Sequence, residues 1–304
     1  MRSTERPALF SRWLLPAASA IAMLLGVGAA WAQSSTATVS TATTTATTTA
    51  TTTATTIASS APDTTVASGL RWHWATSAGL NSYTEPGLMR LQGPEMGLHL
   101  RLSDASWGGH WGLEADVLYG RQDYESLNTG RLTNIPNIET RSRIMYAHTA
   151  QRTSGPAMGL SYGLAVHTLW NNLDGTTTTG AGGYVRKAIQ LWAPVRWRTG
   201  LAPGSWASAW TAEGGLLISG QHTSVLSQVS AVYPDVTNRQ DKGAYLQFSS
   251  EHRQGLRAGA WSPFVRFTWL GDSDTVAFST NTRNYQGVEP MSRRWQLGAQ
   301  WLLP

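Results

Sequence analysis

The sequence predicts an all-β protein, a transmembrane up-and-down antiparallel barrel of about ten strands. Three observations favour this fold class. Apolar and polar residues alternate in segments of about 10 to 14 residues. Short and long connections alternate between those segments. The chain also combines 15 Trp and 30 Gly with only 13% charged residues, roughly half the usual charged fraction of soluble domains, and it has no long apolar run after the first 30 residues.

The first 32 residues are predicted to be a cleaved secretory signal peptide. Residues 1–12 carry three arginines against one acid, residues 13–28 are apolar, and residues 30–32 (Ala-Trp-Ala) form a small-x-small cleavage site. A single membrane anchor is the alternative, but the apolar run is short and contains Pro16. The chain has no cysteine, which excludes disulfides, thiolate metal sites, cysteine nucleophiles and a lipoprotein anchor.

Residues 33–68 are predicted to be a disordered arm. Residues 41–56 read TATTTATTTATTTATT, and threonine is a mediocre helix former. The tract lacks the bulky apolar side chains that would offset the entropy lost on ordering. Given the even strand number predicted below, the arm and the C-terminus both belong on the periplasmic side. A tether, an O-glycan acceptor and a plug that enters the barrel from below all remain open for it.

From residue 69 onward the chain reads as alternating strands. In residues 111–121 (WGLEADVLYGR), every second residue from Trp111 to Tyr119 is apolar, while Glu114 and Asp116 take the other parity. Successive side chains of a strand face opposite sides, so one face is apolar and the other carries two carboxylates. The same pattern recurs in ten segments: 70–80, 96–102, 111–121, 144–150, 160–170, 185–197, 206–216, 244–248, 261–269 and 295–301.

The connections between these segments alternate in length. Links 103–110, 153–156, 199–205 and 251–259 are short and rich in Gly or Pro. The other links are mostly longer: 81–92, 122–139, 171–183, 221–242 and 271–292. Short turns at one end and long loops at the other are typical of a membrane barrel with periplasmic turns and extracellular loops.

Tryptophan positions favour the same arrangement. After the predicted signal peptide, all tryptophans except Trp107 and Trp192 fall on the apolar face. Aromatic rings suit the two membrane interfaces because the ring is buried while its polar atom stays hydrated. A soluble β-sandwich is the alternative, but strands of this length are too long for it. The predicted interface aromatics are Trp72, Trp111, Tyr119, Trp170, Trp197, Trp206, Trp261, Trp269, Trp295 and Trp301.

With this pattern, residues 70–304 resemble the bacterial outer-membrane β-barrel superfamily. The resemblance depends on the overall pattern, without a diagnostic motif. Members usually end with an aromatic residue on the last strand, whereas here Trp301 is followed by Leu302, Leu303 and Pro304. The resemblance implies a Gram-negative outer membrane, contact with lipid and lipopolysaccharide, and handling by the secretion translocon and the barrel-assembly machinery.

The residues that alternate with the apolar ones face the barrel interior, and many of them are charged. Two functions follow from them: cross-lumen ion pairs that fill a structural barrel, or a narrow pore whose excess of arginine favours anions. The predicted lumen-lining residues are Arg71, His73, Glu95, His99, Arg101, Glu114, Asp116, Arg141, Arg143, His167, Arg186, Arg196, Glu213, Glu251, Arg253, Arg266 and Arg294.

An outer-membrane enzyme is a further alternative. Ten strands is also the architecture of omptin-type proteases, and a Ser-His lipid-modifying enzyme would need a pairing such as His222 with Ser219 or Ser224. His148 is set aside because its parity places it on the apolar face. The remaining rim candidates are Asp123, Asp174, Asp241, Asp272 and Asp274.

Surface recognition is the last class considered. Loops 171–183 and 281–287 are rich in Thr, Asn and Gly, which suits hydrogen bonding to a ligand or another cell. The small net charge, +5 for the whole chain, argues against nucleic acid as a partner. The leading prediction is a non-enzymatic structural or porin-like barrel, with no catalytic residue, metal or cofactor. The oligomeric state stays open.

Overall fold

The computed structural model describes residues 70–104, 111–150, 158–200, 206–253, 260–280 and 282–303. Within these ranges the chain is β-strand and loop, apart from a short 3-10 helix at Leu226–Gln228. The predicted signal peptide and threonine-rich arm lie outside the described residues. Among the described residues, no helix is long and apolar enough to cross a membrane.

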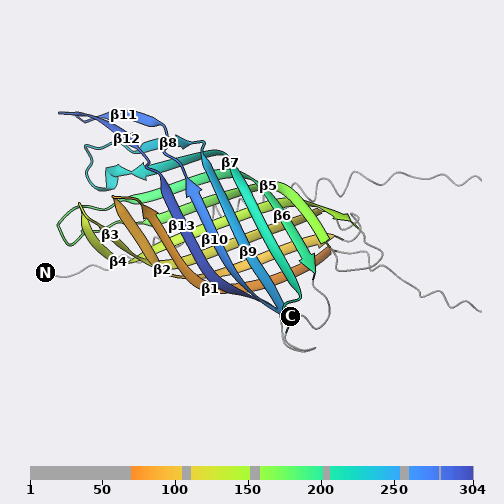
Figure 1. Ribbon diagram of the computed structural model, residues 1–304. Helices are drawn as coiled ribbons and strands as arrows, with labels where there is room; N and C mark the ends of the chain where they lie inside the picture. The colour runs from red at the N-terminus through yellow and green to blue at the C-terminus, as the bar shows by residue number, and fades with distance from the viewer. Residues whose placement is uncertain are drawn as a thin grey trace, which may run out of the picture. The chain divides into compact units, whose positions relative to one another are not determined.

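Ten antiparallel strands close into a barrel (Figure 1). Their order is β6-β5-β4-β3-β2-β1-β13-β10-β9-β7, and the pairing of β6 with β7 closes the ring. The all-β fold and the ten-stranded up-and-down barrel predicted from the sequence are confirmed, and this is the architecture of outer-membrane β-barrels. The strands are β1 (Leu70–Glu85), β2 (Met89–Asp104), β3 (Trp111–Ser126), β4 (Gly130–Ala150), β5 (Met158–Asn172), β6 (Val185–Gly200), β7 (Ala209–Val225), β9 (Gly243–Arg253), β10 (Ala260–Leu270) and β13 (Ser292–Leu302).

The two ends of the barrel differ in their connections. Leu70 of β1 pairs with Asp104 of β2, and Ala75 pairs with Leu302 of β13, so the first strand begins and the last strand ends at the same edge. At that edge, called here the short-turn end, β2, β4, β6 and β9 end, and β3, β5, β7 and β10 begin. The opposite edge, called the long-connection end, carries residues 173–184, 226–242 and 271–291.

Burial follows the two-residue period of the sequence. Along β3, Gly112, Glu114, Asp116, Leu118 and Gly120 are buried, and the residues between them are partly or fully exposed. The buried parity faces the barrel interior, and the other parity faces outward. The barrel therefore carries its charges inside and its large apolar side chains outside, the reverse of a water-soluble fold.

Two of the five predicted long loops are wrong. The β1–β2 turn comprises only 86–88 and the β3–β4 turn only 127–129, so most of 81–92 and 122–139 is strand. The physical reason is a small apolar cluster at the long-connection end. Leu91 and Ile135 are buried there against Leu173, with Tyr83 and Leu132 packed around them, so inward side chains stabilise these strands beyond the apolar outer face.

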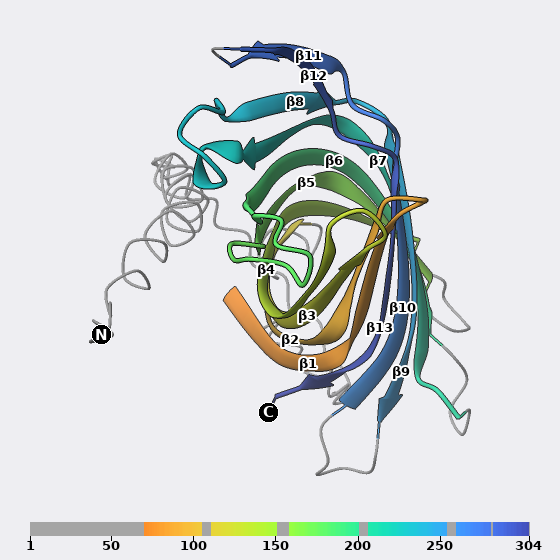
Figure 2. The same cartoon turned by 90° about the vertical axis from the view of Figure 1, so that its left-hand side faces the viewer.

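Three short strands lie beyond the barrel at the long-connection end, which faces the viewer in Figure 2. Strand β8 (Val236–Gln240) pairs with the last residues of β7, from Gly220 to Ser224. Strands β11 (Thr275–Ser279) and β12 (Asn284–Val288) form a hairpin next to β8. Connection 173–184 folds inward over the mouth, where Thr178 exchanges hydrogen bonds with the backbone of Arg131.

Candidate functional site

The barrel interior holds three clusters of charged side chains, which follow one another along the strands. The upper cluster, at the long-connection end, is Tyr83, Glu85, Arg186, His222 and Glu289. The middle cluster is Asn81, Glu95, Glu139, Arg141, Arg294 and Gln296. The lower cluster, nearest the short-turn end, is Glu114, Asp116, Arg143, Arg196, Glu213 and Tyr245.

The upper cluster is centred on Arg186, which is 3% exposed. Its Nη2 lies 2.5 Å from Oε1 of Glu85 and also contacts Glu289. The hydroxyl of Tyr83 donates to Glu85 at 2.7 Å, and Nδ1 of His222 lies 3.0 Å from Oε2 of Glu289. Because β1, β6, β7 and the connection before β13 each supply a residue, the cluster crosses the full width of the barrel at this level.

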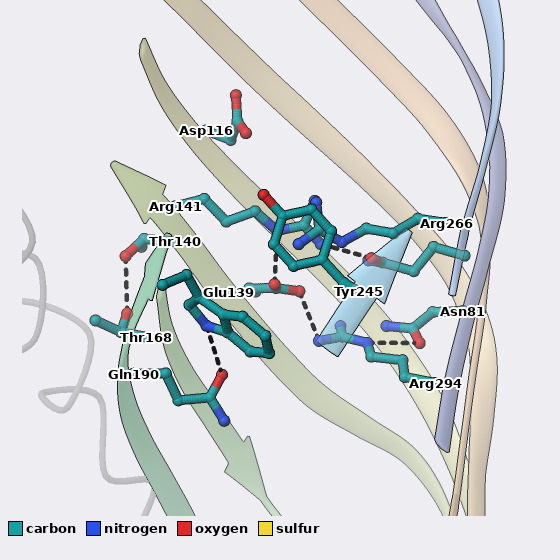
Figure 3. Close-up of polar contacts among 12 residues, drawn as sticks. Asn81, Asp116, Glu139, Thr140, Arg141, Thr168, Gln190, Tyr245, Arg266 and Arg294 are labelled. Atoms are coloured by element: carbon teal, nitrogen blue, oxygen red, sulfur yellow. Dashed lines mark hydrogen bonds and ion pairs between the residues drawn. The ribbon is translucent and has the colours of Figure 1, made fainter. Parts of the chain in front are cut away.

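In the middle cluster two arginines share one carboxylate (Figure 3). Nη1 of Arg294 lies 2.7 Å from Oε2 of Glu139, and Nε of Arg141 lies 2.7 Å from its Oε1. Gln296 accepts from Nη2 of Arg141 at 2.5 Å and donates to Glu95 at 2.7 Å. Asn81 is hydrogen-bonded to both Glu95 and Arg294. The middle cluster therefore links β1, β2, β4 and β13.

The lower cluster is an interlocked set of ion pairs. Arg143 contacts three carboxylates: Glu114 at 3.1 Å, Asp116 at 2.7 Å and Glu213 at 3.2 Å. Arg196 binds both oxygens of Glu114, at 2.6 and 2.7 Å, and donates from Nε to Glu213 at 2.6 Å. Two guanidiniums therefore alternate with three carboxylates. Arg101 adds a longer contact to Glu114, at 3.8 Å, and Nδ1 of His99 lies 2.9 Å from Asp116.

An aromatic cluster fills the space beside the charges. Trp192 is completely buried and packs edge to face on Tyr245, with ring centroids 5.3 Å apart. The guanidinium of Arg266 lies 3.7 Å from the centroid of Tyr245, a cation–π contact. A register shift between β6 and β7 occurs at Leu191 and Trp192. What remains open next to this cluster is a cavity of about 50 Å³, large enough for one or two water molecules.

Gly215 makes room for this packing, and its replacement gives a test. A Cβ at Gly215 would lie 2.3 Å from Cε1 of Tyr245, whereas at the neighbouring Gly214 the nearest atom would be 3.6 Å away. We expect Gly215→Ala to lower the free energy of unfolding by about 1 to 3 kcal/mol through overpacking. Gly214→Ala is the matched control and should change it much less. Urea titrations of the refolded barrel measure both, and equal losses would contradict the packing described for Tyr245.

The structure brings most of the predicted lumen-lining residues into these clusters. Glu95, Glu114, Asp116, Arg141, Arg143, His167, Arg186, Glu213 and Arg266 are buried, and His99, Arg196, Glu251 and Arg294 are partly buried. His73 and Arg101 are exposed and lie opposite each other in the β1–β2 register, and Arg101 reaches Glu114 of the lower cluster at 3.8 Å. The side chains of Arg71 and Arg253 lie outside the described residues.

The charge balance differs from the predicted excess of arginine. The buried acids include Glu85, Glu139 and Glu289, which the sequence analysis did not place in the lumen. They were missed because they fall within segments predicted as loops. Glu139 has the same parity as Arg141 and Arg143, so a longer fourth strand would have revealed it. With these acids included, each of the three clusters contains both signs of charge.

The predicted interface aromatics occupy the outer surface to different extents. Among the six exposed ones, the exposed fraction ranges from 40% for Trp197 to 68% for Trp206, which precedes β7 rather than lying in it. Trp72, Trp111, Trp295 and Trp301 are also exposed, and Tyr119, Trp170, Trp261 and Trp269 are partly exposed. At the short-turn end the ring of His252 stacks on Trp261, with centroids 4.7 Å apart. Their position at two membrane interfaces stays a prediction.

Three of the five rim aspartates accept hydrogen bonds from backbone amides. Asp272 accepts from the amide of Met291 at 2.7 Å, Asp274 from the amide of Arg239 at 2.6 Å, and Asp123 from the amide of Asn134 at 3.0 Å. These contacts order the loops. Asp174 and Asp241 are exposed.

Neither histidine candidate lies in a rim loop beside a serine. His222 was predicted in a loop, but it lies within β7 and is buried, because β7 continues to Val225 in its pairing with β8. Its Nδ1 faces Glu289 instead of a serine. His148 is exposed on β4.

A larger cavity, of about 400 Å³, lies at the long-connection end above the upper cluster. Its walls come from the β1–β2 and β3–β4 hairpins, connection 173–184, the end of β7 with β8, and the β11–β12 hairpin. Apolar and aromatic side chains line most of the walls, among them Leu132, Leu173, Tyr124, Phe278 and Tyr285. Glu85, Arg186 and Glu289 form its charged floor.

Comparison with known proteins gives distant likenesses to solved structures. No family model matches the sequence, and no curated protein matches it. Neisserial surface protein A (NspA) has a TM-score of 0.34 at 9% identity, covering 77% of this chain and 98% of that one. A mutant of the TodX monoaromatic hydrocarbon channel has 0.31 at 11% identity, covering 78% and 67%. An anion-selective porin from Comamonas acidovorans has 0.21 at 7% identity, covering 78% and 100%. Likenesses this distant carry over no activity or ligand.

Proposed function

We propose that the protein is an integral outer-membrane barrel with a closed lumen and without enzymatic activity, and that it acts at its long-connection end. The observation that carries this proposal is the succession of the three charged clusters across the interior. A solute that passes through the barrel would have to separate ion pairs in each cluster. Separating one buried pair leaves an uncompensated charge and costs about 3 to 5 kcal/mol.

The outer surface supports a membrane location. Nine of the barrel strands each expose a large aliphatic side chain, with exposed fractions from 39% at Val117 to 67% at Leu216. In water this ring of apolar surface would be unfavourable, and lipid is the solvent that suits it. The residues are Leu80, Met96, Val117, Ile144, Leu164, Ile189, Leu216, Leu246 and Leu297.

The difference between the two sets of connections supports one orientation. The short-turn end is proposed to face the periplasm, with the N-terminal arm and the C-terminus, and the long-connection end to face outward among lipopolysaccharide. During biogenesis the secretion translocon would export the chain and the barrel-assembly machinery would insert it. Protease treatment of intact cells tests this topology: cleavage within 226–242 or 271–291 is expected, and cleavage within the arm would reverse the orientation.

A planar-bilayer recording tests the closed lumen. The refolded chain is expected to insert without discrete conductance steps, because paired charges fill the interior at three levels. Insertion is verified separately by the heat-modifiability shift of the recovered protein on a gel. Steps in the untreated wild-type chain, especially steps with anion selectivity, would establish the alternative of a narrow anion-favouring pore and end the proposal. Protease and lipase assays on the same preparation are expected to show no activity.

A further inference from the structure

The cavity at the long-connection end has the dimensions of a small-molecule site. Its volume of about 400 Å³ lies within the range of about 300 to 1,000 Å³ that is usual for such sites. It is closed below by the upper cluster, so it is a blind pocket as long as the lumen is closed. Its walls are mostly apolar, which suits a ligand with an apolar body.

The floor of the cavity carries unbalanced charge. Arg186 is the one cation of the upper cluster when His222 is neutral, and it faces two carboxylates, Glu85 and Glu289. The cluster then has one net negative charge. Arg186 is 3% exposed, so its charge is balanced by these two carboxylates rather than by solvent. An anionic head group would be repelled by both carboxylates, whereas a cationic one would restore neutrality.

Aromatic rings line the wall above this floor. Phe278 and Tyr285, on the β11–β12 hairpin, are stacked with their centroids 5.3 Å apart and their planes at 15°. Tyr285 also packs edge to face on Tyr233, at 6.0 Å. Tyr124 lines the opposite wall, from the β3–β4 hairpin. The faces of such rings attract cations, and this attraction is strongest where water is excluded.

We infer that this cavity binds a small organic cation, an ammonium group on an apolar or aromatic body. The ammonium lies over Glu85 and Glu289, and the body packs between Phe278, Tyr285 and the aliphatic wall at Leu132 and Leu173. The inference rests on the proposed closed lumen, because an open lumen would make the same space a pore mouth. It gives the long-connection end a ligand of defined chemistry.

Isothermal titration of the full-length chain, refolded in a non-ionic maltoside detergent at pH 8, tests this inference. The probes are benzyltrimethylammonium, the neutral N-benzylacetamide and the anionic 3-phenylpropionate, which are similar in size. The cation is expected to bind with a dissociation constant below about 1 mM, a modest affinity for a ligand of this size. The neutral probe should bind at least about tenfold more weakly, and the anion should not bind. Equal or tighter binding of the anion, or no binding of any probe, overturns the inference.

Two variants locate the site. Glu289→Gln removes the net charge of the floor and should weaken cation binding about tenfold while leaving the neutral probe unchanged. Phe278→Ala lies on the hairpin outside the barrel, so it leaves the barrel intact, and it should weaken both probes. Glu125→Gln is the matched control, since Glu125 is an exposed acid of the β3 end that does not line the cavity. If Glu125→Gln weakens the cation as much as Glu289→Gln does, binding is general surface attraction and the site is refuted.

The test separates this inference from the proposed closed lumen. Conductance and binding are measured on the same preparation. Absence of binding with a silent bilayer refutes the ligand and leaves the closed barrel standing. Conductance steps refute the closed barrel, and steps that benzyltrimethylammonium blocks would place the cation in a pore mouth and refute the blind site as well.

Discussion

Replacement of Glu213 by alanine is expected to lower the free energy of unfolding of the barrel by about 3 to 5 kcal/mol. Glu213 is 2% exposed and accepts from Arg143, Arg196 and the hydroxyl of Tyr245. Without it, Arg143 and Arg196 would each lose a buried carboxylate partner, and the hydroxyl of Tyr245 would lose its acceptor. The loss should be measured by urea titration of the refolded chain, followed by tryptophan fluorescence.

Two further variants separate lost charge from lost volume. Glu213→Gln keeps the shape and an acceptor for Tyr245 but removes the charge, so most of the loss should remain. Glu125→Ala breaks the ion pairs with Arg90 and Arg131, where the acid is 43% exposed and solvent screens the charges, so it should cost much less than Glu213→Ala. A Glu213→Ala chain as stable as Glu125→Ala would show that the lower cluster does not stabilise the barrel.

Trp192→Ala is expected to cost about 3 to 5 kcal/mol as well, through the cavity it leaves. Trp192 is completely buried against Ala165, Leu217 and Tyr245. The new cavity should join the small one beside His167 and Arg266 without opening a pore, because the three charged clusters remain. The expected result is therefore a less stable barrel that still gives a silent bilayer recording.

The outcome of the Trp192 variant discriminates between two ways of closing the lumen. Trp206→Ala is the control, since Trp206 is 68% exposed before β7 and should contribute much less to stability. If Trp192→Ala conducts while Glu213→Gln stays silent, the aromatic cluster rather than the charges closes the barrel. That result would mean that Trp192, and not the ion pairs, closes the lumen.

The alternation in the sequence was sufficient for the fold because a strand has a strict two-residue period. Ten segments with one apolar face predicted ten strands. Their even number predicted that the first strand begins and the last strand ends at the same edge, and the register agrees. The prediction of loops at 81–92 and 122–139 was wrong because it used the apolar outer face to define strand length. Inward residues such as Leu91 and Ile135 continue the strands where that outer face has already become polar.

The candidate site was predicted less completely than the fold. Parity identified Glu114, Arg143 and Glu213 as inward, but parity says nothing of which charge meets which across the barrel. Arg143 and Glu213 are 70 residues apart, and Arg186 and Glu289 are 103 apart. The cavity at the long-connection end combines five segments of the chain, and no local pattern marks it.

Amino-acid order was thus enough for the class of fold, the parity of each strand and the inward position of most charges, because these depend on local periodicity. Barrel closure settled the rest. It brought β6 against β7 and placed Trp192 in the barrel interior. It also paired four inward arginines with carboxylates from other strands: Arg143, Arg186, Arg196 and Arg294. Whether inward charges line a pore or fill it depends on distances across the lumen, and those distances exist only once the ring of ten strands is closed.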